Sequence, residues 1–356
     1  MTRRDPRTAT GHTGRMTPLD TWRRHAEDLL PDPVVEYFAQ GAGASVAASE
    51  AVAAWDRHRL RPRVLRDVTT VSTATTVLGH RLDTPVLVAP TTLQRRAHPE
   101  GEAATALGTR RAGSLMCVST NAGTPFAEIG AVGPWWLQVY LWRDRALSAA
   151  LLDRAREAGA TAVVLTADTP QVGAKTVAGD SVWDLVGPGE LLANLDVTDV
   201  PDTALDKARD LTLADIDRLR DLTGLPVVVK GVLRGDDARA CAEAGAAAVW
   251  VSNHGGRQLD RAVPTAVALP EVVADLADTE TEIYVDGGLR CGEHVLTALA
   301  LGAHAVFLGR PVLWALATDG ADGVARLLTE LTDRLRHAMT LAGATGIADL
   351  TPDLVA

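Results

Sequence analysis

One phrase recurs along this chain after residue 85: an amphipathic stretch ends in Ala-Gly or Leu-Gly, and a short apolar run follows at once. It reads RRAGSLMCVS, EAGATAVVLTAD, EAGAAAVWVSNH and LGAHAVFLGR. Each glycine is suited to end a helix, and each run behind it is continuously apolar, as in a strand buried within a parallel sheet. The phrase therefore predicts helices that alternate with parallel strands.

Four further runs are also continuously apolar, although no Ala-Gly or Leu-Gly stands before them: PVLVAP, PWWLQVY, PVVVKG and EIYVDGG. They raise the predicted number of strands to eight. Eight β-then-α units with no strand-only region predict an α/β fold, the (β/α)8 TIM barrel, whose active site lies at the C-terminal ends of the strands. The alternative is a doubly wound open sheet, which usually carries a Gly-rich turn after its first strand. PVLVAPTTLQ lacks that turn, so the sequence favours the barrel.

Other segments lie outside the repeat. Residues 1–16 predict a disordered extension, and residues 17–356 a single barrel domain. Within it, residues 17–84 predict an N-terminal helical cap that ends in a short hairpin around VLGHRLDTP. Residues 171–210 interrupt the fourth unit with glycine, proline and acidic residues and predict a lid loop. The helical pattern over 321–343 predicts the eighth barrel helix.

Composition and charge exclude several classes of protein. With a net charge of -10 and no run of Lys or Arg, the chain lacks the basic face that nucleic-acid binding requires. Cys117, Cys241 and Cys291 lie far apart, which fits neither a disulfide framework nor a metal site and predicts a reducing, cytoplasmic setting. No uncharged apolar run reaches the roughly 18 residues of a membrane span.

Polar residues gather where the predicted strands end. In strand order they are Thr91; Ser119; Gln138 and Tyr140; Thr166 and Asp168; Lys230; Ser252, His254 and Arg257; Asp286, Gly288 and Arg290; and Gly309 with Arg310. One such residue is weak evidence, because a strand-end Thr or Ser often satisfies backbone groups. Their joint occurrence at one end of the barrel predicts a ligand site there.

The loops DGGLR and LGR follow the seventh and eighth predicted strands, where barrels most often bind a phosphate. Glycine amides can approach the phosphate closely, and Arg290 and Arg310 supply positive charge. A simple tight turn at Gly287 and Gly288 is the alternative, but it leaves both arginines unexplained. Because the chain has neither a P-loop nor a dinucleotide fingerprint, these loops favour a mononucleotide cofactor.

Lys230 and His254 are the residues on which the predicted chemistry depends. Lys230 ends an apolar strand, so its ammonium needs a partner in the barrel mouth. That partner is either a substrate carbonyl, as in a Schiff base, or an electron-rich cofactor ring, and the phosphate loops favour the ring. His254 is a candidate general base that Asp168 could orient. No serine or cysteine nucleophile accompanies the pair.

Several long motifs stand in one order from about residue 30 to 345: RPRVLRDV, APTTLQRRAHPEGE, LQVYLWRDR, LTADTP, LPVVVKGV, SNHGGRQLD, VDGGLR and ALGAHAVFLGRPV. On these motifs the chain resembles the FMN-dependent 2-hydroxy-acid oxidase and dehydrogenase family, which includes glycolate oxidase, lactate oxidase and mandelate dehydrogenase. Its length and the phrase HGGRQLDRAVP are most similar to 4-hydroxymandelate oxidases. The resemblance implies FMN as cofactor, a small 2-hydroxy acid as substrate, O2 or another oxidant as electron acceptor, and a homo-oligomer, often a tetramer.

The resemblance also implies a role for each matching residue. His254 would be the base, paired with Asp168, while Tyr37 and Tyr140 would hydrogen-bond the substrate's oxygen atoms and Arg257 its carboxylate. The flavin ring would contact Thr91, Ser119, Gln138, Thr166, Lys230 and Ser252. The ribityl phosphate would contact Asp286, Gly288, Arg290, Gly309 and Arg310.

One stretch departs from the family. Where relatives usually read DTPRLGRR, this chain reads DTPQVGAK, so Lys175 replaces the second arginine of the carboxylate clamp, and the lid behind it is shorter. Lysine lacks the bidentate fork of arginine. We therefore expect intact flavin binding and altered substrate recognition, either a modified clamp for a 2-hydroxy acid or a pocket for a noncarboxylate, amide or larger substrate.

Aromatic and small residues near the site add two expectations. Trp142 could line a pocket that accepts an aromatic substrate, whereas Trp135 and Trp136 are at least as well suited to the core. By the resemblance, Thr92 would lie near the flavin at a position where relatives carry alanine or glycine. The sequence therefore does not decide which electron acceptor the protein uses.

Two other functions compete with oxidation. An FMN-dependent isomerase would carry out no net redox change, and the His254, Asp168 and Tyr140 set argues against it. A catalytically inactive flavin-binding protein would explain the altered residues 171–175, yet His254 is retained beside Asp168.

Overall fold

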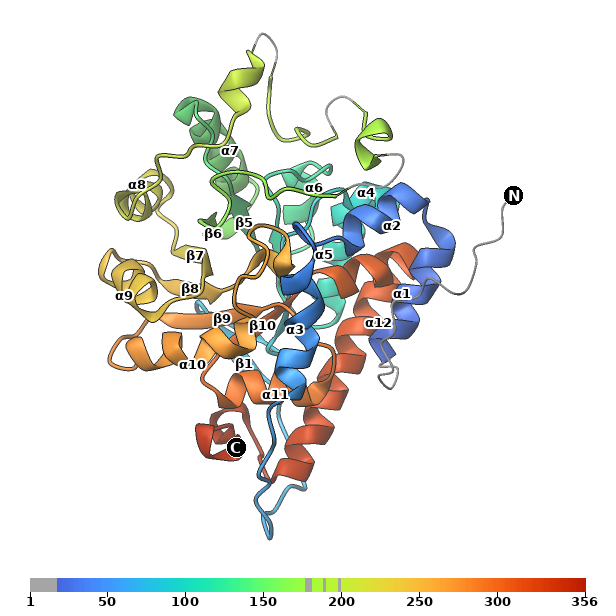
Figure 1. The fold of residues 1–356 in the computed structure, drawn as a ribbon, viewed down its shortest axis with the longest axis vertical. Helices are drawn as coiled ribbons and strands as arrows, with labels where there is room; N and C mark the ends of the chain where they lie inside the picture. The colour runs from blue at the N-terminus through green and yellow to red at the C-terminus, as the bar shows by residue number, and fades with distance from the viewer. Residues whose placement is uncertain (1–17, 177–180, 188–189, 198–199) are drawn as a thin grey trace.

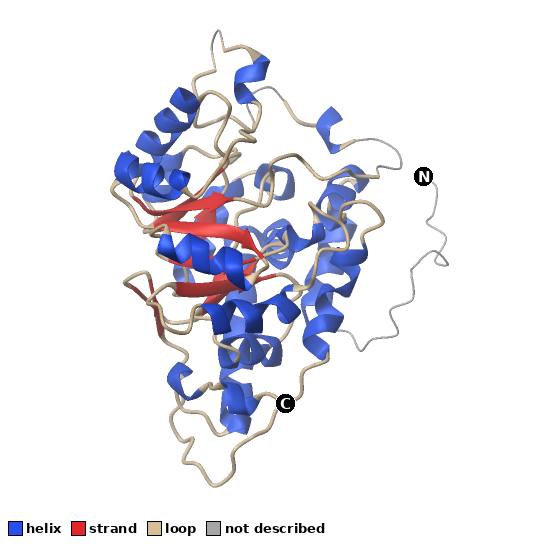
Figure 2. Ribbon diagram, turned by 60° about the vertical axis from the view of Figure 1, so that its left-hand side comes forward, coloured by secondary structure: helices blue, strands red, loops and turns tan. Residues whose placement is uncertain are grey.

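A closed barrel of eight parallel strands forms the centre of the computed structural model, which describes residues 18–176, 181–187, 190–197 and 200–356. The strands follow the order β10-β3-β4-β5-β6-β7-β8-β9 around the barrel, and helices surround them (Figures 1 and 2). Their bounds are β3 Val86–Val88, β4 Met116–Val118, β5 Trp135–Val139, β6 Ala160–Thr166, β7 Val227–Val232, β8 Ala248–Val251, β9 Glu282–Asp286 and β10 Ala305–Leu308. The predicted (β/α)8 barrel is confirmed.

Strand residues are buried on both faces, which explains why their sequences are continuously apolar. Alternate residues point into the barrel, where Trp136, Trp250, Tyr284 and Phe307 are at most 1% exposed. The Trp250 and Phe307 rings stack with centroids 3.7 Å apart. Trp135 points outward instead and packs on Phe126. The interior is therefore a packed core, and both Trp135 and Trp136 belong to the core.

The glycines of the recurring phrase lie at the turns between helices and strands. Gly113, Gly159, Gly245 and Gly302 have φ values of 64°, 86°, 86° and 110°, in the range that L-residues avoid. The helices around the barrel are α4 Gln94–Ala97, α5 Gly101–Arg111, α6 Phe126–Gly130, α7 Arg145–Glu157, α8 Ala214–Thr223, α9 Gly235–Glu243, α10 Thr265–Asp275, α11 Gly292–Ala300 and α12 Arg310–Ala342. Helix α12 begins earlier than the predicted 321–343 and kinks at Asp319 and Gly320. The local pattern thus located the helix but missed its first turns.

The N-terminal segment covers both ends of the barrel. Helices α1 Pro18–Leu29, α2 Asp32–Ala39 and α3 Val46–Asp56 form the cap, and the residues from 57 to 74 are not helical. A hairpin of β1 Thr75–Val77 and β2 His80–Leu82 follows. Val77 is buried with the barrel interior, and the Leu78 backbone N–H donates to Glu282 Oε1 at 3.0 Å. The hairpin therefore closes the end of the barrel where the strands begin. The predicted extension, residues 1–16, lies outside the described residues.

The predicted lid, residues 171–210, contains the short helices η2 Val182–Asp184 and η3 Asp202–Leu205, and residues 177–180, 188–189 and 198–199 are outside the description. Its middle is fastened to the barrel, because Asn194 Oδ1 accepts from the Phe126 N–H at 2.7 Å and Asn194 Nδ2 donates to the Thr124 carbonyl. Nearer its start, Trp183 packs edge-on against Tyr37 of α2, with ring centroids 5.5 Å apart. The lid is thereby joined to the cap.

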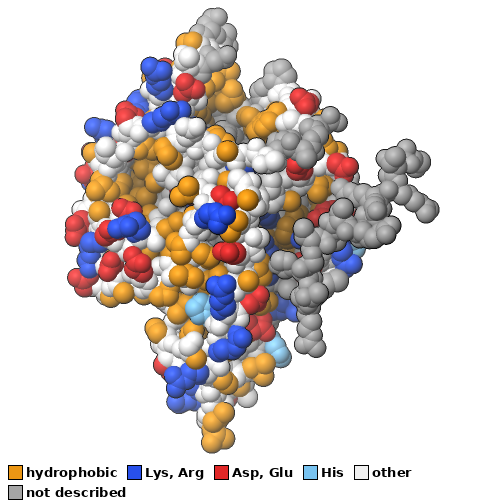
Figure 3. All heavy atoms as spheres, viewed as in Figure 1, with side chains coloured by type: hydrophobic (Ala, Val, Ile, Leu, Met, Phe, Trp, Pro, Cys, Tyr) orange, Lys and Arg blue, Asp and Glu red, His pale blue; other side chains and the backbone are white. Residues whose placement is uncertain are grey.

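Acidic and basic side chains are interspersed around α9 on the face shown in Figure 3. Arg234 pairs with Asp236, and Arg239 pairs with Asp278 at 2.5 Å. Among the helices that the structure describes, none is long and apolar enough to cross a membrane.

Candidate active site

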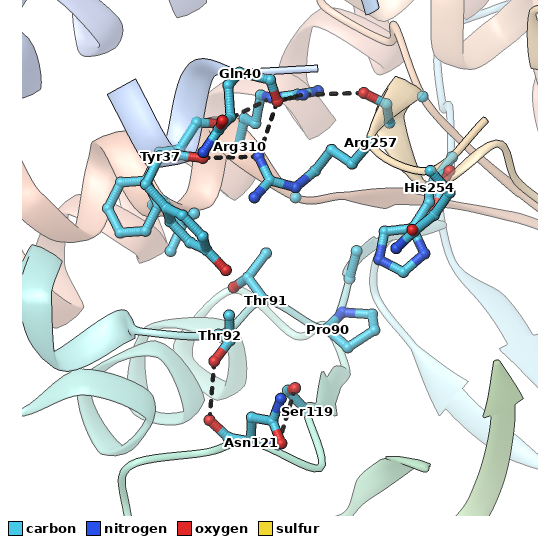
Figure 4. A pocket seen from close by; sticks show the side chains of 18 of the residues that line it. Tyr37, Gln40, Pro90, Thr91, Thr92, Ser119, Asn121, His254, Arg257 and Arg310 are labelled. Carbon is cyan, nitrogen blue, oxygen red and sulfur yellow. Dashed lines mark hydrogen bonds between the residues drawn. The ribbon is translucent and has the colours of Figure 1, made fainter. Parts of the chain in front are cut away.

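A cavity of about 360 Å³ lies at the C-terminal ends of the barrel strands, between the cap and the lid. Figure 4 shows His254, Arg257 and Arg310 along one side of it and Thr92, Ser119 and Asn121 along another, with Tyr37 between them. Most of the residues predicted from the sequence line it: Tyr37, Thr91, Ser119, Gln138, Tyr140, Thr166, Lys175, Lys230, His254, Arg257, Asp286, Gly288, Arg290, Gly309 and Arg310. The barrel thus brings together residues from every part of the chain.

Lys230 stands in a buried network at the end of β7. Its Nζ donates to Ser252 Oγ at 2.8 Å, and Ser252 Oγ donates to Asp286 Oδ1 at 2.8 Å. Lys230 Nζ also lies 3.5 Å from Asp286 Oδ2, and the two side chains are only 4% and 9% exposed. A buried ammonium that is paired and hydrogen-bonded in this way keeps one position. Ser252 lies behind Lys230 and does not itself line the cavity.

His254 and Asp168 form a second, partly buried pair between the ends of β8 and β6. His254 Nδ1 lies 2.9 Å from Asp168 Oδ1, which leaves the Nε2 edge of the ring for the cavity. Burial lowers the pKa of His254, although Asp168 opposes this shift, so the ring is neutral near neutral pH. Burial alone would raise the pKa of Asp168, but the charge and hydrogen bond of His254, with Lys230, bring it down to about 2. The pair is therefore a carboxylate beside a neutral base.

The turn that presents His254 has an unusual backbone. His254, Gly255 and Gly256 have φ values of 58°, 64° and 73°. A left-handed conformation costs a residue other than glycine about 1–2 kcal/mol, so it persists only where other contacts hold it. Here the His254 N–H donates to Ser252 Oγ at 3.0 Å, and the Gly256 N–H donates to Asn253 Oδ1 at 3.2 Å. The glycines in SNHGGRQLD thus serve a tight turn that aims the imidazole into the cavity.

Tyr140 and Thr169 complete the surroundings of His254. Tyr140 Oη lies 3.4 Å from His254 Nε2, and burial, with the nearby charge of Asp168, raises the pKa of its phenol. Thr169 Oγ1 donates to Asp168 Oδ1 at 3.0 Å. Sequence reasoning missed Thr169, although it directly follows Asp168 in LTADTP. Tyr140 is therefore a neutral hydroxyl that can share a substrate atom with His254.

Cationic side chains meet the cap on the other side of the cavity. Arg257 donates to the backbone carbonyls of Tyr37 and Gln40 at 2.7 and 2.9 Å, and its guanidinium lies 4.8 Å from the Tyr37 ring centroid. Arg310 donates to Phe38, Gln40 and Gly255 carbonyls. Lys175 Nζ donates to the Arg257 carbonyl, and burial, together with Arg257 and Arg310, lowers its pKa to about 8. Three positive charges therefore gather here, which favours an anionic ligand.

Helix α3 supports the loop DGGLR from outside. Trp55 Nε1 donates to the Gly287 carbonyl at 2.7 Å. His294 Nδ1 accepts from the Arg290 N–H at 3.2 Å, while its Nε2 lies 2.9 Å from Asp56 Oδ1. The cap therefore fixes the backbone from which Arg290 and the glycine amides reach the cavity.

Replacing Gly288 with alanine is expected to lower the free energy of unfolding by about 2–5 kcal/mol. Gly288 has a φ of +84°, and an added Cβ would lie 2.2 Å from the Ala51 carbonyl oxygen of α3. Gly79 is a matched control, because its φ is +79° and an added Cβ meets nothing within 4 Å. Gly79→Ala should cost only the backbone strain, about 1–2 kcal/mol. Chemical denaturation of both variants measures the difference, and equal losses would contradict the close contact with α3.

Two further features show what the cavity is suited to hold. Gln138 Nε2 and Thr166 Oγ1 are buried at the strand ends and have no hydrogen-bond partner among the described residues. Arg290 and Arg310 are partly buried, and desolvation lowers their pKa values to about 10 and 9. Unpaired buried polar atoms and desolvated guanidinium groups are costly, and a bound ligand that contacts both would offset that cost. A planar, hydrogen-bonding ring with an anionic tail would satisfy both sets.

Sequence reasoning was wrong on one predicted pocket residue and missed others. Trp142 does not line the cavity; it is 4% exposed and packs in the core. An aromatic wall is supplied instead by Trp183 of the lid, and Lys207 lines the cavity as well. Both lie in the lid, which has little regular secondary structure, so the spacing of its residues does not predict which of them reach the cavity.

Comparison with known proteins places the chain among flavin enzymes. The profile of the family described as FMN-dependent dehydrogenase matches residues 26–356. The chain is 38% identical to glycolate oxidase 3 of Oryza sativa subsp. indica over 94% of this chain and 95% of that protein. It is 40% identical to an L-lactate oxidase of Nostoc sp., with 93% and 96% covered. For 2-hydroxyacid oxidase 1 of Homo sapiens the identity is 37%, with 96% of each chain covered.

Solved structures agree with the sequence comparison. A crystal structure of mandelate oxidase superposes with a TM-score of 0.86 at 39% identity and covers 96% of this chain and 98% of its own. A variant of mandelate oxidase with 2-hydroxy-phenylacetamide gives the same TM-score at 38% identity, with the same shares covered.

Proposed function

This chain belongs to the FMN-dependent dehydrogenase family, and we propose that it oxidises a 2-hydroxy acid to the 2-oxo acid with His254 as the base. The family makes it an FMN-dependent oxidoreductase of the 2-hydroxy-acid oxidase group. The observation that carries the role of His254 is its geometry: Asp168 engages Nδ1 at 2.9 Å, and Nε2 lies 3.4 Å from Tyr140 Oη at the cavity.

The chain's own residues would hold FMN in the following way. The unpaired Gln138 Nε2 and Thr166 Oγ1 would hydrogen-bond the edge of the ring, beside the fixed ammonium of Lys230. Thr91 and Ser119 would complete the ring's surroundings, while Ser252 would act through Lys230, whose ammonium it holds. The two loops with Gly288, Arg290, Gly309 and Arg310 would bind the phosphate. When bound, FMN supplies a ring that accepts two electrons.

Proton transfer falls to the pair of His254 and Asp168. Neutral His254 would take a proton from the substrate at Nε2, and the Asp168 carboxylate would stabilise the imidazolium that forms. Tyr140 would donate its hydroxyl to a substrate oxygen, as would Tyr37. The same base serves whether the proton comes from the hydroxyl group or from the α-carbon, so the geometry supports both routes.

Recognition of the substrate carboxylate would depend on Arg257 and Lys175. Arg257 is held by two carbonyls of the cap, and Lys175 is held by the Arg257 backbone carbonyl, so both cations have fixed positions at the same edge of the cavity. Because a lysine offers one point of charge rather than a fork, the carboxylate would bind more loosely than between two arginines. The structure of one mandelate oxidase variant contains 2-hydroxy-phenylacetamide, which is a 2-hydroxy amide. Amides are therefore suitable test compounds beside the 2-hydroxy acids.

An anaerobic screen of flavin reduction tests the proposed function. Purified protein is expected to contain FMN, and its visible absorbance should bleach with aliphatic or aromatic 2-hydroxy acids. Lys175→Arg should improve the apparent affinity for simple acids by about 10-fold, because a bidentate pair adds a charge-assisted hydrogen bond, and should leave the matching amides unchanged. Bleaching by amides alone would show that Lys175 serves a noncarboxylate substrate. Failure of every 2-hydroxy acid, ester and amide to bleach the flavin would overturn the proposal.

We further propose O2 or another oxidant as electron acceptor, a homotetramer and a cytoplasmic location. Cys117 and Cys241 are buried free thiols, which suits a reducing compartment. Light scattering tests the assembly, and oxygen consumption tests the acceptor.

A further inference from the structure

Lys207, near the end of the lid, is held firmly at the edge of the cavity. Its backbone forms an antiparallel bridge with Trp142, just after β5. On either side, the Ala208 N–H donates to the Leu141 carbonyl at 2.8 Å, and the Arg143 N–H donates to the Asp206 carbonyl at 2.7 Å. This part of the lid is therefore a fixed extension of the barrel, and the position of the Lys207 side chain is set by β5.

The side chain of Lys207 points at the residue that contacts the proposed base. Its Nζ lies 3.5 Å from the centroid of the Tyr140 ring, and it lines the same cavity as His254. Burial lowers the pKa of Lys207 to about 8, while the charge of Asp168 acts in the opposite direction. No salt bridge joins Lys207 to a carboxylate within the part of the chain that the structure describes. A partly buried ammonium in this state favours an anionic partner.

The charged groups already assigned to the proposed reaction have partners of their own. Asp168 engages His254, and Asp286 engages Ser252 and Lys230. Arg257 and Lys175, which we assign to the substrate's carboxylate, are tied to the cap and to each other. Lys207 is therefore an additional cation, placed over the face of the Tyr140 ring. A substrate with a single carboxylate, bound by Arg257, would give Lys207 no anion to pair with.

We propose that Lys207 binds a second carboxylate at the far end of the substrate's side chain. The inference rests on the proposed function and narrows its substrate class to 2-hydroxy acids that carry a distal carboxylate. The reaction itself is unchanged, because the distal group takes no part in the transfer of the proton or the two electrons. Lys207 is thus a specificity-determining residue.

Matched substrates test this assignment in the FMN-loaded enzyme. 2-Hydroxyglutarate and 2-hydroxypentanoate have carbon chains of equal length and differ in the distal carboxylate; 4-carboxymandelate and mandelate form an aromatic pair. Stopped-flow flavin reduction without oxygen gives a dissociation constant for each. The wild-type enzyme is expected to bind one or both dicarboxylates at least 10-fold more tightly than their partners. Lys207→Met should weaken that binding by about 10- to 100-fold, the effect of a lost charge-assisted hydrogen bond, and change the monocarboxylates by less than about 2-fold.

Two further variants separate charge from structure. Lys207→Arg should retain most of the preference, because the charge remains. Arg209→Met removes a charge from the exposed surface of the same segment and should leave the preference intact. An equal effect of Lys207→Met on both members of each pair would overturn the inference and indicate that Lys207 acts through Tyr140. Equal wild-type affinities would overturn it too, while flavin reduction by the monocarboxylates would leave the proposed function standing. Absence of reduction by all four acids would remove both.

Discussion

His254→Asn is expected to slow anaerobic flavin reduction by about 10²- to 10⁴-fold while FMN remains bound, which is the usual contribution of a positioned general base. Asparagine keeps a polar side chain in the turn but cannot accept the substrate proton. The imidazole it replaces is held by Asp168 at 2.9 Å and lies 3.4 Å from Tyr140 Oη. Stopped-flow absorbance gives the rate constant, and the flavin spectrum gives the content. His25→Asn, on an exposed part of α1, is the matched control and should behave as wild type.

The pH dependence of the wild-type rate provides a second measurement of the same role. Burial lowers the pKa of His254, so the neutral, proton-accepting form persists to lower pH than for a free imidazole. The rate constant for flavin reduction should therefore rise with pH through a value below about 6.5 and be level above it. In His254→Asn this rise of the rate constant with pH should disappear. If the variant kept the same rise with pH, or turned over at nearly the wild-type rate, His254 would not be the base.

The barrel could be predicted because its signals are local. A continuous apolar run and the glycine before it describe a strand and a turn within about ten residues, and Gly113, Gly159, Gly245 and Gly302 all lie at such turns. The polar residues at the strand ends could be grouped for the same reason, since eight parallel strands bring their ends to one face. Fold and cavity therefore followed from short-range pattern combined with one topological rule.

Contacts made by the cap and the lid could not be predicted in this way. Arg257 donates to the carbonyl of Tyr37, 220 residues away, and a backbone carbonyl leaves no mark in the sequence. Trp142 was expected in the pocket because it follows β5, yet its segment pairs with the lid and its indole turns into the core. Trp183 and Lys207 reach the cavity from a loop without regular spacing. Such positions depend on tertiary packing that no local pattern encodes.

Removing both phosphate arginines, as in the double variant Arg290→Met and Arg310→Met, is expected to weaken FMN binding by about 10²- to 10⁴-fold. Both side chains are partly buried, and desolvation lowers their pKa values to about 10 and 9, so a bound anion would offset a desolvation cost. Riboflavin lacks the phosphate and should bind wild type and variant alike, as measured by flavin fluorescence quenching. Arg326→Met, which removes another arginine stacked on an indole but outside the cavity, is the control. If both flavins weakened equally, the arginines would be holding α2 and Trp314 in place rather than binding the phosphate.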